Sequence, residues 1–258
     1  MTLYDSIGKN YNLTRQPDPR IVTKLISLLD LPTGSMIADI GAGTGNYSNA
    51  IAQKGYRVLA IEPSAVMQGQ RQHHPDVRWI TAKAEEIPLA DKTVDGALIM
   101  LALHHFNDLD QGIREISRIT KSGKLVIFAF EQEQISNFWL TDYFPYFTRD
   151  TLTTFPSTEK IASLISQITQ KETAIIPFLL PTNLSDLFAA SGWCKPKIYL
   201  DDQVRCGIST FAKMPINELK AGLKRLRVDI DHGFWVRKYG HLLNQKEYDG
   251  GYRILVTK

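Results

Sequence analysis

Short apolar runs alternate with amphipathic segments over the first half of the chain. The runs predict strands at 36–40, 57–61, 77–81, 93–100 and 124–130. The segments 46–54 and 109–120 repeat apolar residues at helical spacing and predict helices. The run at 93–100 continues into 101–106 without alternation, which is typical of a strand buried on both faces. The order predicts an α/β fold with a doubly wound, seven-stranded, mostly parallel sheet.

A glycine-rich turn follows the first strand. The strand M-I-A-D-I ends at Ile40, Gly41, Gly43 and Gly45 alternate after it, and an amphipathic segment begins at Asn46. Glycine has no Cβ, so the backbone can turn tightly and a ligand can lie against the main chain. The first-turn N–H groups of the next helix lack partners and face the same place. Such a turn commonly holds a nucleotide or similar cofactor at the carboxyl edge of a parallel sheet.

The spacing of this turn distinguishes between cofactors. The dinucleotide fingerprint is G-x-G-x-x-G, but here the third glycine comes one place early and Asp39 stands two residues before the first. This argues against an NAD-dependent oxidoreductase. The pattern D-x-G-x-G-x-G instead resembles the first motif of the class I S-adenosylmethionine-dependent methyltransferases of the methyltransferase 11 type. This resemblance implies a Rossmann-like core, S-adenosyl-L-methionine as cofactor, and Ala42 within the cofactor turn.

A carboxylate ends the second strand. Glu62 lies 21 residues after Gly41, close to the spacing of about 20 for an acid that binds ribose hydroxyls. A strand end that faces solvent is the alternative. The sequence E-P-S-x-x-M resembles the second motif of the family, which adds Pro63 and Met67 to the expected cofactor contacts.

Two later segments extend the resemblance. The loop A-K-A-E-E-I-P-L (82–89) is similar to the family pattern G-D-A-E-x-L-P, but Lys83 replaces the acid that would recognise the adenine amino group. Ala84 and Glu85 remain as expected adenine contacts. The segment L-A-L-H-H-F (101–106) matches the fourth motif, so Leu101 is also expected at the cofactor.

The first thirty residues predict a lid followed by a helix. Pro17 and Pro19 precede a helical pattern from Arg20 to Leu29. The resemblance implies that this segment folds over the cofactor, with Tyr11 and Arg15 near the cofactor carboxylate or the substrate. A frayed, solvated terminus is the alternative. A guanidinium suits bidentate carboxylate binding, which favours the functional interpretation for Arg15.

The second half of the chain is less regular. The pattern at 183–200 predicts a short helix and a strand, and 251–258 predicts the last strand. The resemblance implies that these two strands form an antiparallel terminal hairpin. The two remaining segments, 131–182 and 201–250, are expected to form a cap. The first is rich in aromatic residues, and the second contains apolar residues at helical spacing. The predicted division is 1–30 (N-terminal lid and helix), 31–130 (cofactor-binding core), 131–182 (cap insertion), 183–200 (core helix and strand), 201–250 (second cap insertion) and 251–258 (last core strand).

The composition of the chain argues against several classes of binding partner. The 258 residues carry a formal net charge of +3, which does not suggest a nucleic-acid-binding protein. No apolar run reaches the roughly 18 residues of a membrane span, and the N-terminus has no signal-peptide pattern. Cys194 and Cys206 form neither a disulfide framework nor a metal site. We expect a cytoplasmic location, a small-molecule acceptor, and no nucleic acid, membrane or metal; the oligomeric state is open.

Two histidines are the candidates for catalysis. His104 and His105 follow the fourth strand, and imidazole titrates near neutrality, as a general base for a hydroxyl acceptor requires. The alternative is that one packs in the core and the other touches the cofactor. The sequence does not decide between oxygen, nitrogen and carbon as the methylated atom. A non-catalytic S-adenosylmethionine-binding protein with the same fold is the alternative function.

Overall fold

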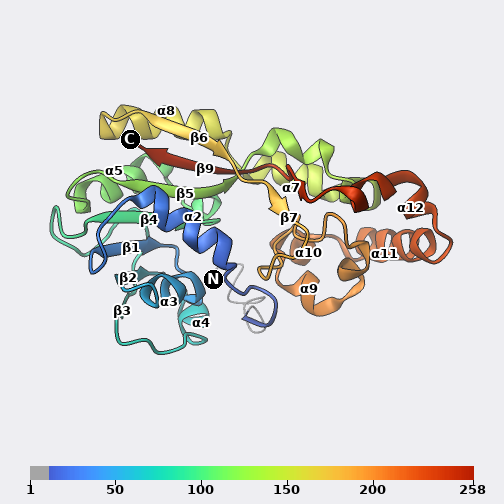
Figure 1. Ribbon diagram of the computed structural model, residues 1–258, viewed down its shortest axis with the longest axis horizontal. Coiled ribbons are helices and arrows are strands. Elements are labelled where there is room, and N and C mark those ends of the chain that lie inside the picture. The colour runs from blue at the N-terminus through green and yellow to red at the C-terminus, as the bar shows by residue number, and fades with distance from the viewer. Residues whose placement is uncertain (1–11) are drawn as a thin grey trace.

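Five parallel strands alternate with helices in the first half of the chain. The computed structural model describes residues 12–258. The parallel strands are β1 Met36–Ile40, β2 Arg57–Ile61, β3 Val77–Ile80, β4 Gly96–Met100 and β5 Leu125–Phe130. The last strand, β9 Tyr252–Thr257, runs antiparallel between β5 and β6 Thr173–Pro177. The sheet order is β3-β2-β1-β4-β5-β9-β6, which confirms the predicted seven-stranded fold (Figure 1).

Helices cover both faces of the sheet because the strands bury side chains on both sides. One face packs on α2 Pro19–Leu29 and α3 Asn46–Ala52, through residues such as Ile37 and Val58. The other packs on α5 Leu109–Ile119 and α8 Thr158–Thr169, through residues such as Ile40 and Ile99. Between β3 and β4 the chain crosses in turns, without a helix of its own. This crossover is therefore short and irregular.

Strand register brings the predicted motifs to one edge. Asp39 of β1 pairs in register with Ala60 of β2 and Leu98 of β4, so the three strands end together. Gly41 follows β1, Glu62 follows β2 and Leu101 follows β4. The short helix α4 Ala65–Gln68 begins just after Glu62.

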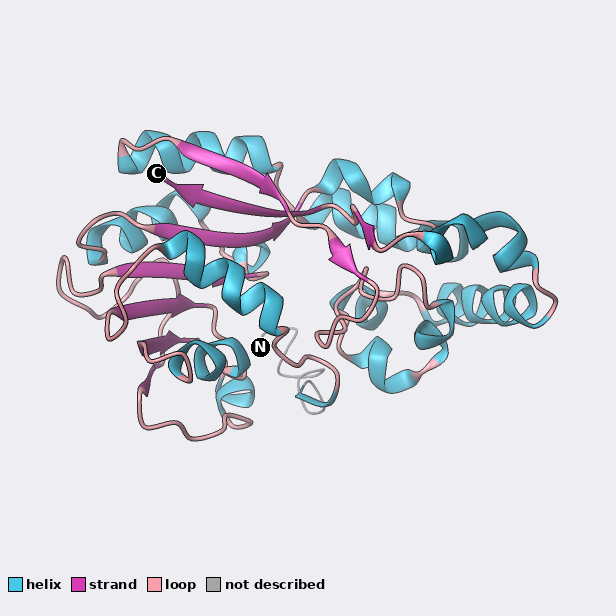
Figure 2. Cartoon of the chain, viewed as in Figure 1, coloured by secondary structure: helices cyan, strands magenta, loops and turns pink. Residues whose placement is uncertain are grey.

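A second lobe stands beyond this edge, and we call it the cap lobe (residues 131–157 and 178–251). It is mostly helical (Figures 1 and 2). Its elements are η3 Gln132–Asn137, α6 Leu140–Tyr143, α7 Tyr146–Thr154, β7 Leu180–Pro181, η4 Pro196–Leu200, α9 Asp202–Cys206, α10 Ser209–Lys213, α11 Ile216–Asp231, α12 Phe234–Tyr239, η5 Gly240–Asn244 and β8 Glu247–Tyr248. Trp139 lies in the core of the cap lobe. The indole N–H of Trp139 donates to the carbonyl of Trp193 at 2.7 Å, and the centroid of its ring lies 5.3 Å from that of Trp235.

Two predicted core elements were wrong. The segment 195–200 is the 3₁₀ helix η4 and not a strand, and 183–192 consists of turns and not a helix. Pro196 has no N–H to donate to a strand ladder, which disfavours a strand there. The antiparallel partner of β9 is β6, within the stretch predicted as cap, and α8 of the same stretch covers the sheet. The β-branched residues at 173 and 175–176 suit that paired position.

Candidate functional site

The largest opening that contains the predicted motifs lies at the carboxyl edge of the strands, and we call it the turn cavity. Its volume is about 440 Å³, within the range of about 300–1,000 Å³ usual for small-molecule sites. It is lined by Gly41, Gly43, Glu62, Pro63, Ser64, Met67, Ala82, Lys83, Ala84, Glu85, Met100, Leu101, Ala102, His105, Phe106 and Asn107. A larger hollow beside Leu59 and Leu89 contains none of the predicted site residues.

The glycine turn has a backbone that only glycine adopts easily. Gly41, Gly43 and Gly45 have φ angles of 73°, 59° and 79°, in the left-handed region that other residues avoid. A Cβ on Gly41 would stand 2.6 Å from the Cβ of Ala102, and one on Gly45 would stand 2.4 Å from the Trp79 ring. Glycine is therefore required in this turn both by the positive φ angles and by the lack of room for a Cβ at Gly41 and Gly45.

Glu62 faces the turn, as the sequence predicted. Its carboxylate accepts hydrogen bonds from the main-chain N–H of Gly43 at 2.9 Å and of Ser64 at 2.8 Å. The side chain is largely buried but lines the turn cavity. Two main-chain donors thus hold the carboxylate between the ends of β1 and β2, where it can accept hydrogen bonds from a ligand.

Asp39 lies beneath the turn, beside a small recess that we call the tail recess. Its Oδ2 accepts a hydrogen bond from the Ser48 hydroxyl at 2.5 Å, while its buried Oδ1 has no partner in the described part of the chain. Burial raises the pKa of Asp39 to about 6, and the charge of Glu62 adds to this rise. Arg15, Gly41, Ala42 and Gly43 also line the recess.

Arg15 connects the N-terminal segment to the cap lobe. Its Nε donates to Asp186 at 2.5 Å, and the Tyr47 hydroxyl donates to the same carboxylate at 3.0 Å. Asp186 is fully buried. Arg15 lines both the tail recess and a further cavity between the sheet edge and the cap lobe. Tyr11, predicted to lie beside it, is outside the described residues.

The loop predicted to contact adenine does reach the turn cavity. Lys83, Ala84 and Glu85 all line it. The Glu85 carboxylate is engaged by the start of α5, because it accepts from the main-chain N–H of Asn107 at 2.5 Å and of Asp108 at 3.1 Å. Glu85 therefore shapes the cavity wall by holding the neighbouring segment, a role that the sequence pattern did not indicate.

A second opening lies between the sheet edge and the cap lobe, and we call it the aromatic cavity. Its volume is about 80 Å³. Its walls are Arg15, Leu101, His104, Phe130, Ile135, Phe138, Phe147, Thr151, Phe155, Phe188, Ala189, Ala190, Gly207, Ile208, Ser209, Thr210 and Tyr252. Leu101 lines this cavity and the turn cavity alike, so the two adjoin at that residue. Apart from Arg15, Leu101 and His104, the wall residues belong to no motif and come from segments far apart in sequence, which is why the sequence did not reveal them.

The two candidate histidines line different cavities. His104 lines the aromatic cavity, and His105 lines the turn cavity. Burial lowers the pKa of His104 well below 6.5, and the charges of His105, Lys213 and Arg15 act in the same direction. His105 is exposed at its cavity. Packing around its ring lowers its pKa to about 4, and the charge of Lys213 acts in the same direction.

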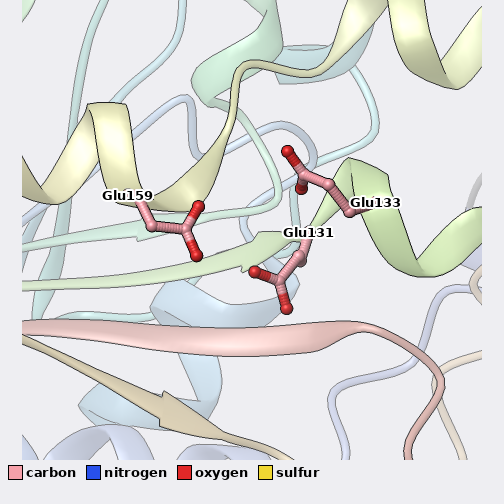
Figure 3. A group of neighbouring side chains, drawn as sticks. All are labelled: Glu131, Glu133 and Glu159. Carbon is pink, nitrogen blue, oxygen red and sulfur yellow. The ribbon is translucent and has the colours of Figure 1, made fainter.

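Three carboxylates that line neither of these cavities meet near the end of β5. Glu131, Glu133 and Glu159 have ligand atoms within 4.8 Å of one another (Figure 3). Glu131 is already engaged, because Arg253 lies 2.7 Å from its Oε2 and the Thr158 hydroxyl donates to its Oε1 at 2.9 Å. The guanidinium of Arg253 supplies the positive charge that a cation would otherwise provide.

The comparisons agree with the geometry. A family profile described as "Methyltransferase domain" matches residues 38–128. A demethylmenaquinone methyltransferase of Corynebacterium urealyticum is 33% identical over 168 residues, which cover 63% of this chain and 70% of that protein. A malonyl-[acyl-carrier protein] O-methyltransferase of Pectobacterium atrosepticum is 34% identical over 107 residues, or 41% of this chain and 42% of that protein.

A solved structure is similar over nearly the whole chain. It is a methyltransferase described as from an antibiotic biosynthesis pathway of Anabaena variabilis, with 46% identity, a TM-score of 0.92, and coverage of 95% of this chain and 99% of that one. The chain belongs to the class I S-adenosylmethionine-dependent methyltransferases. It is an enzyme that uses S-adenosyl-L-methionine as its methyl donor.

The described residues fit this cofactor on their own geometry. The turn cavity has sufficient volume, the glycine turn admits close approach, and Asp39 keeps an unpartnered buried oxygen.

None of the helices within residues 12–258 combines the length and apolarity that crossing a bilayer requires.

Proposed function

We propose that the turn cavity holds the nucleoside of S-adenosylmethionine, with Glu62 accepting hydrogen bonds from the ribose hydroxyls. The support is the position of Glu62, whose carboxylate is held by Gly43 and Ser64 at the cavity wall. Pro63 and Met67 form the neighbouring wall. Gly41, Ala42, Gly43 and Gly45 bring the main chain against the ligand.

The amino-acid end of the cofactor lies in the tail recess in this proposal. An ammonium group there would meet the unpartnered Oδ1 of Asp39, and a carboxylate would meet the Arg15 guanidinium. Asp186 also lines this recess and pairs with Arg15, so the cofactor carboxylate would share the guanidinium with Asp186. Tyr11 is retained as a proposed contact from the sequence alone.

The adenine lies against the loop at 83–85 in this proposal. The main-chain N–H of Ala84 donates to no carbonyl within residues 12–258 and is available for the ring. The Glu85 carboxylate is occupied by main-chain donors, so it supports the wall. Leu101 contacts the cofactor from the β4 side.

Methyl transfer goes to a small molecule held between the sheet edge and the cap lobe. S-adenosylmethionine supplies an electrophilic methyl group, and the protein must align the acceptor atom with it. Such positioning supplies roughly 7–11 kcal/mol. We propose that the cap lobe selects the acceptor, and that His104 or His105 removes a proton where the acceptor requires it.

Two free cysteines, Cys194 and Cys206, support a cytoplasmic location.

Calorimetry with S-adenosylhomocysteine tests the cofactor site. Glu62→Gln removes the charge, and a hydrogen bond to a charged group is worth about 1.5–3 kcal/mol, so Kd should rise roughly 10- to 100-fold. The exposed Glu86→Gln is the matched control and should leave Kd unchanged. Equal binding by native protein and Glu62→Gln would remove the basis of the proposal.

A second experiment separates an enzyme from a protein that only binds the cofactor. Native protein is incubated with methyl-labelled S-adenosylmethionine and a cell metabolite extract, and labelled products are sought. Label in a small molecule supports the proposal. Cofactor binding without transfer to any fraction would favour the non-catalytic alternative.

A further inference from the structure

We infer that the aromatic cavity is the acceptor site, and that it takes an uncharged, ring-bearing hydroxyl compound that is methylated on oxygen while His104 accepts the hydroxyl proton. This inference rests on the proposed function, since it requires the cofactor to lie in the turn cavity. It adds the acceptor's position, its chemical class and the methylated atom.

The walls of the cavity define the class of acceptor. They include the rings of Phe130, Phe138, Phe147, Phe155 and Phe188, and they contain no carboxylate. Aromatic faces favour a flat apolar molecule. A cationic amine would find no acidic partner here, and an uncompensated charge is costly to bury. The hydroxyls of Thr151, Ser209 and Thr210 line the same cavity and can orient polar substituents.

The charges near the cavity are already paired. Arg15 is bonded to Asp186. Lys213 is bonded to the buried Asp150, which also accepts from the Thr210 hydroxyl at 2.8 Å. An anionic acceptor would therefore have to compete with Asp186 or Asp150 for a cation, which again favours an uncharged molecule.

Leu101 places the acceptor beside the methyl donor. It is the first residue after β4, and it lines both the aromatic cavity and the turn cavity. Its φ angle is 52°, in a region that a non-glycine residue occupies only under constraint. The backbone reverses here, and η2 Leu103–His105 follows directly. A molecule in the aromatic cavity thus adjoins the cofactor at Leu101.

The imidazole of His104 provides the nitrogen that accepts the proton of the acceptor hydroxyl. Its Nε2 is shielded from water and has no hydrogen-bond partner in the described part of the chain. The ring packs against Phe155, with centroids 4.4 Å apart. A buried polar atom without a partner is uncommon in folded proteins, and an acceptor hydroxyl would satisfy it.

The chemical step balances with these groups. The acceptor oxygen forms a bond to the methyl carbon, and the carbon–sulfur bond breaks with its electron pair passing to sulfur. The hydroxyl proton passes to Nε2 of His104. The positive charge lost at sulfur equals the charge gained at the imidazole, so the net charge of the site is unchanged. The products are the methyl ether and S-adenosylhomocysteine, and His104 later returns its proton to solvent.

The volume of the cavity limits the acceptor. About 80 Å³ is a small fraction of the 440 Å³ turn cavity, and it suits no more than a single ring. A larger acceptor requires the cap lobe to move away from the N-terminal segment, where Arg15 and Asp186 hold the two together. Phenol is therefore the appropriate probe.

The test uses native protein saturated with S-adenosylhomocysteine, so that cofactor binding is established first by calorimetry. Phenol, benzoate and benzylammonium are each titrated while the ¹⁵N resonances of His104 are followed. Phenol should shift them saturably, and the two charged compounds should not. No shift with phenol in a protein that binds the cofactor would overturn the inference and leave the proposed function standing.

Product analysis completes the test. Labelled S-adenosylmethionine and phenol should give labelled anisole, and His104→Gln should lower that rate roughly 100-fold or more with an unchanged Kd for S-adenosylhomocysteine. The exposed His73→Gln is the control and should behave as native. Labelled cresol from phenol, labelled methyl benzoate from a parallel incubation with benzoate, or full activity in His104→Gln would each overturn the inference.

Discussion

His104 and His105 are adjacent in sequence, and their ring centroids lie 3.8 Å apart, yet they line two different cavities. The 3₁₀ turn after Leu101 produces this division, because successive residues of such a turn point in different directions. Two neighbouring imidazoles can therefore be perturbed separately, one at the cofactor and one at the acceptor.

Substitution of each histidine should give a different kinetic signature. His105→Gln alters a wall of the turn cavity, so we expect a raised KM for S-adenosylmethionine with a smaller effect on kcat. His104→Gln should lower kcat and leave that KM near its native value. Steady-state kinetics with varied cofactor separate the two. The division of roles fails if both variants change the same parameter to the same extent.

The rate should tolerate mild acid. A base must be neutral to accept a proton, and the pKa of His104 lies well below 6.5 because of burial and the nearby charges of His105, Lys213 and Arg15. Protonation therefore begins only at lower pH than for an ordinary histidine, and kcat should stay level as pH falls through 6.5. A pH profile at saturating cofactor checks this, and an inflection at the ordinary value would contradict it.

Asp39→Asn should stabilise the cofactor-free protein at neutral pH. Burial raises the pKa of Asp39 from 3.8 to about 6, so the folded state holds its proton more tightly than the unfolded state. Its stabilising effect is complete below pH 3.8 and is lost as pH rises through about 6. One pKa unit corresponds to about 1.4 kcal/mol, so the ionised carboxylate costs the folded state up to about 3 kcal/mol at pH 7.

Urea unfolding of native protein and Asp39→Asn at pH 5 and pH 8 measures this effect. The variant should gain stability mainly at pH 8, and it should bind S-adenosylhomocysteine more weakly. A variant that is less stable than native at pH 8 would show that the Ser48 hydrogen bond outweighs the burial of charge.

Two glycine substitutions separate backbone strain from lack of space. Gly34 and Gly41 have φ angles of 88° and 73°, but a Cβ on Gly34 meets nothing within 4 Å, whereas one on Gly41 meets Ala102 at 2.6 Å. Gly34→Ala should lose about 1–2 kcal/mol from the left-handed backbone alone. Gly41→Ala should lose more and should weaken cofactor binding. Denaturation and calorimetry on both variants provide the comparison, and equal losses would exclude a steric role for the turn.

The buried ion pair between the N-terminal segment and the cap lobe should be sensitive to truncation. Arg15→Met leaves the carboxylate of Asp186 buried beside Tyr47 without its cation, and such a loss typically costs about 3–5 kcal/mol. Arg114→Met breaks the exposed pair with Asp110 and should give no measurable change. Thermal unfolding of the two variants tests the difference. Similar melting temperatures would mean that Asp186 finds another partner.

The sequence predicted the cofactor half of the molecule well because its signals are local. Strand β1, the glycine turn and Glu62 are close in the chain, and β1 and β2 occur at the predicted residues. The acceptor half depends on tertiary contacts. Phe155 lines the aromatic cavity and Asp186 lines the tail recess, and both come from segments with no motif. The strand pattern at 195–200 did not reveal that β6 is the true partner of β9.

The position of β9 has a consequence for how the chain folds. This strand is buried along its whole length and separates β5 from β6, although it follows β5 by nearly half of the chain. During synthesis, one edge of β5 therefore remains unpaired until β9 has been made. Contacts between segments so distant in sequence also form slowly. An open apolar edge invites intermolecular pairing, so the partly made chain is the stage most exposed to aggregation and the stage at which a chaperone would have most effect.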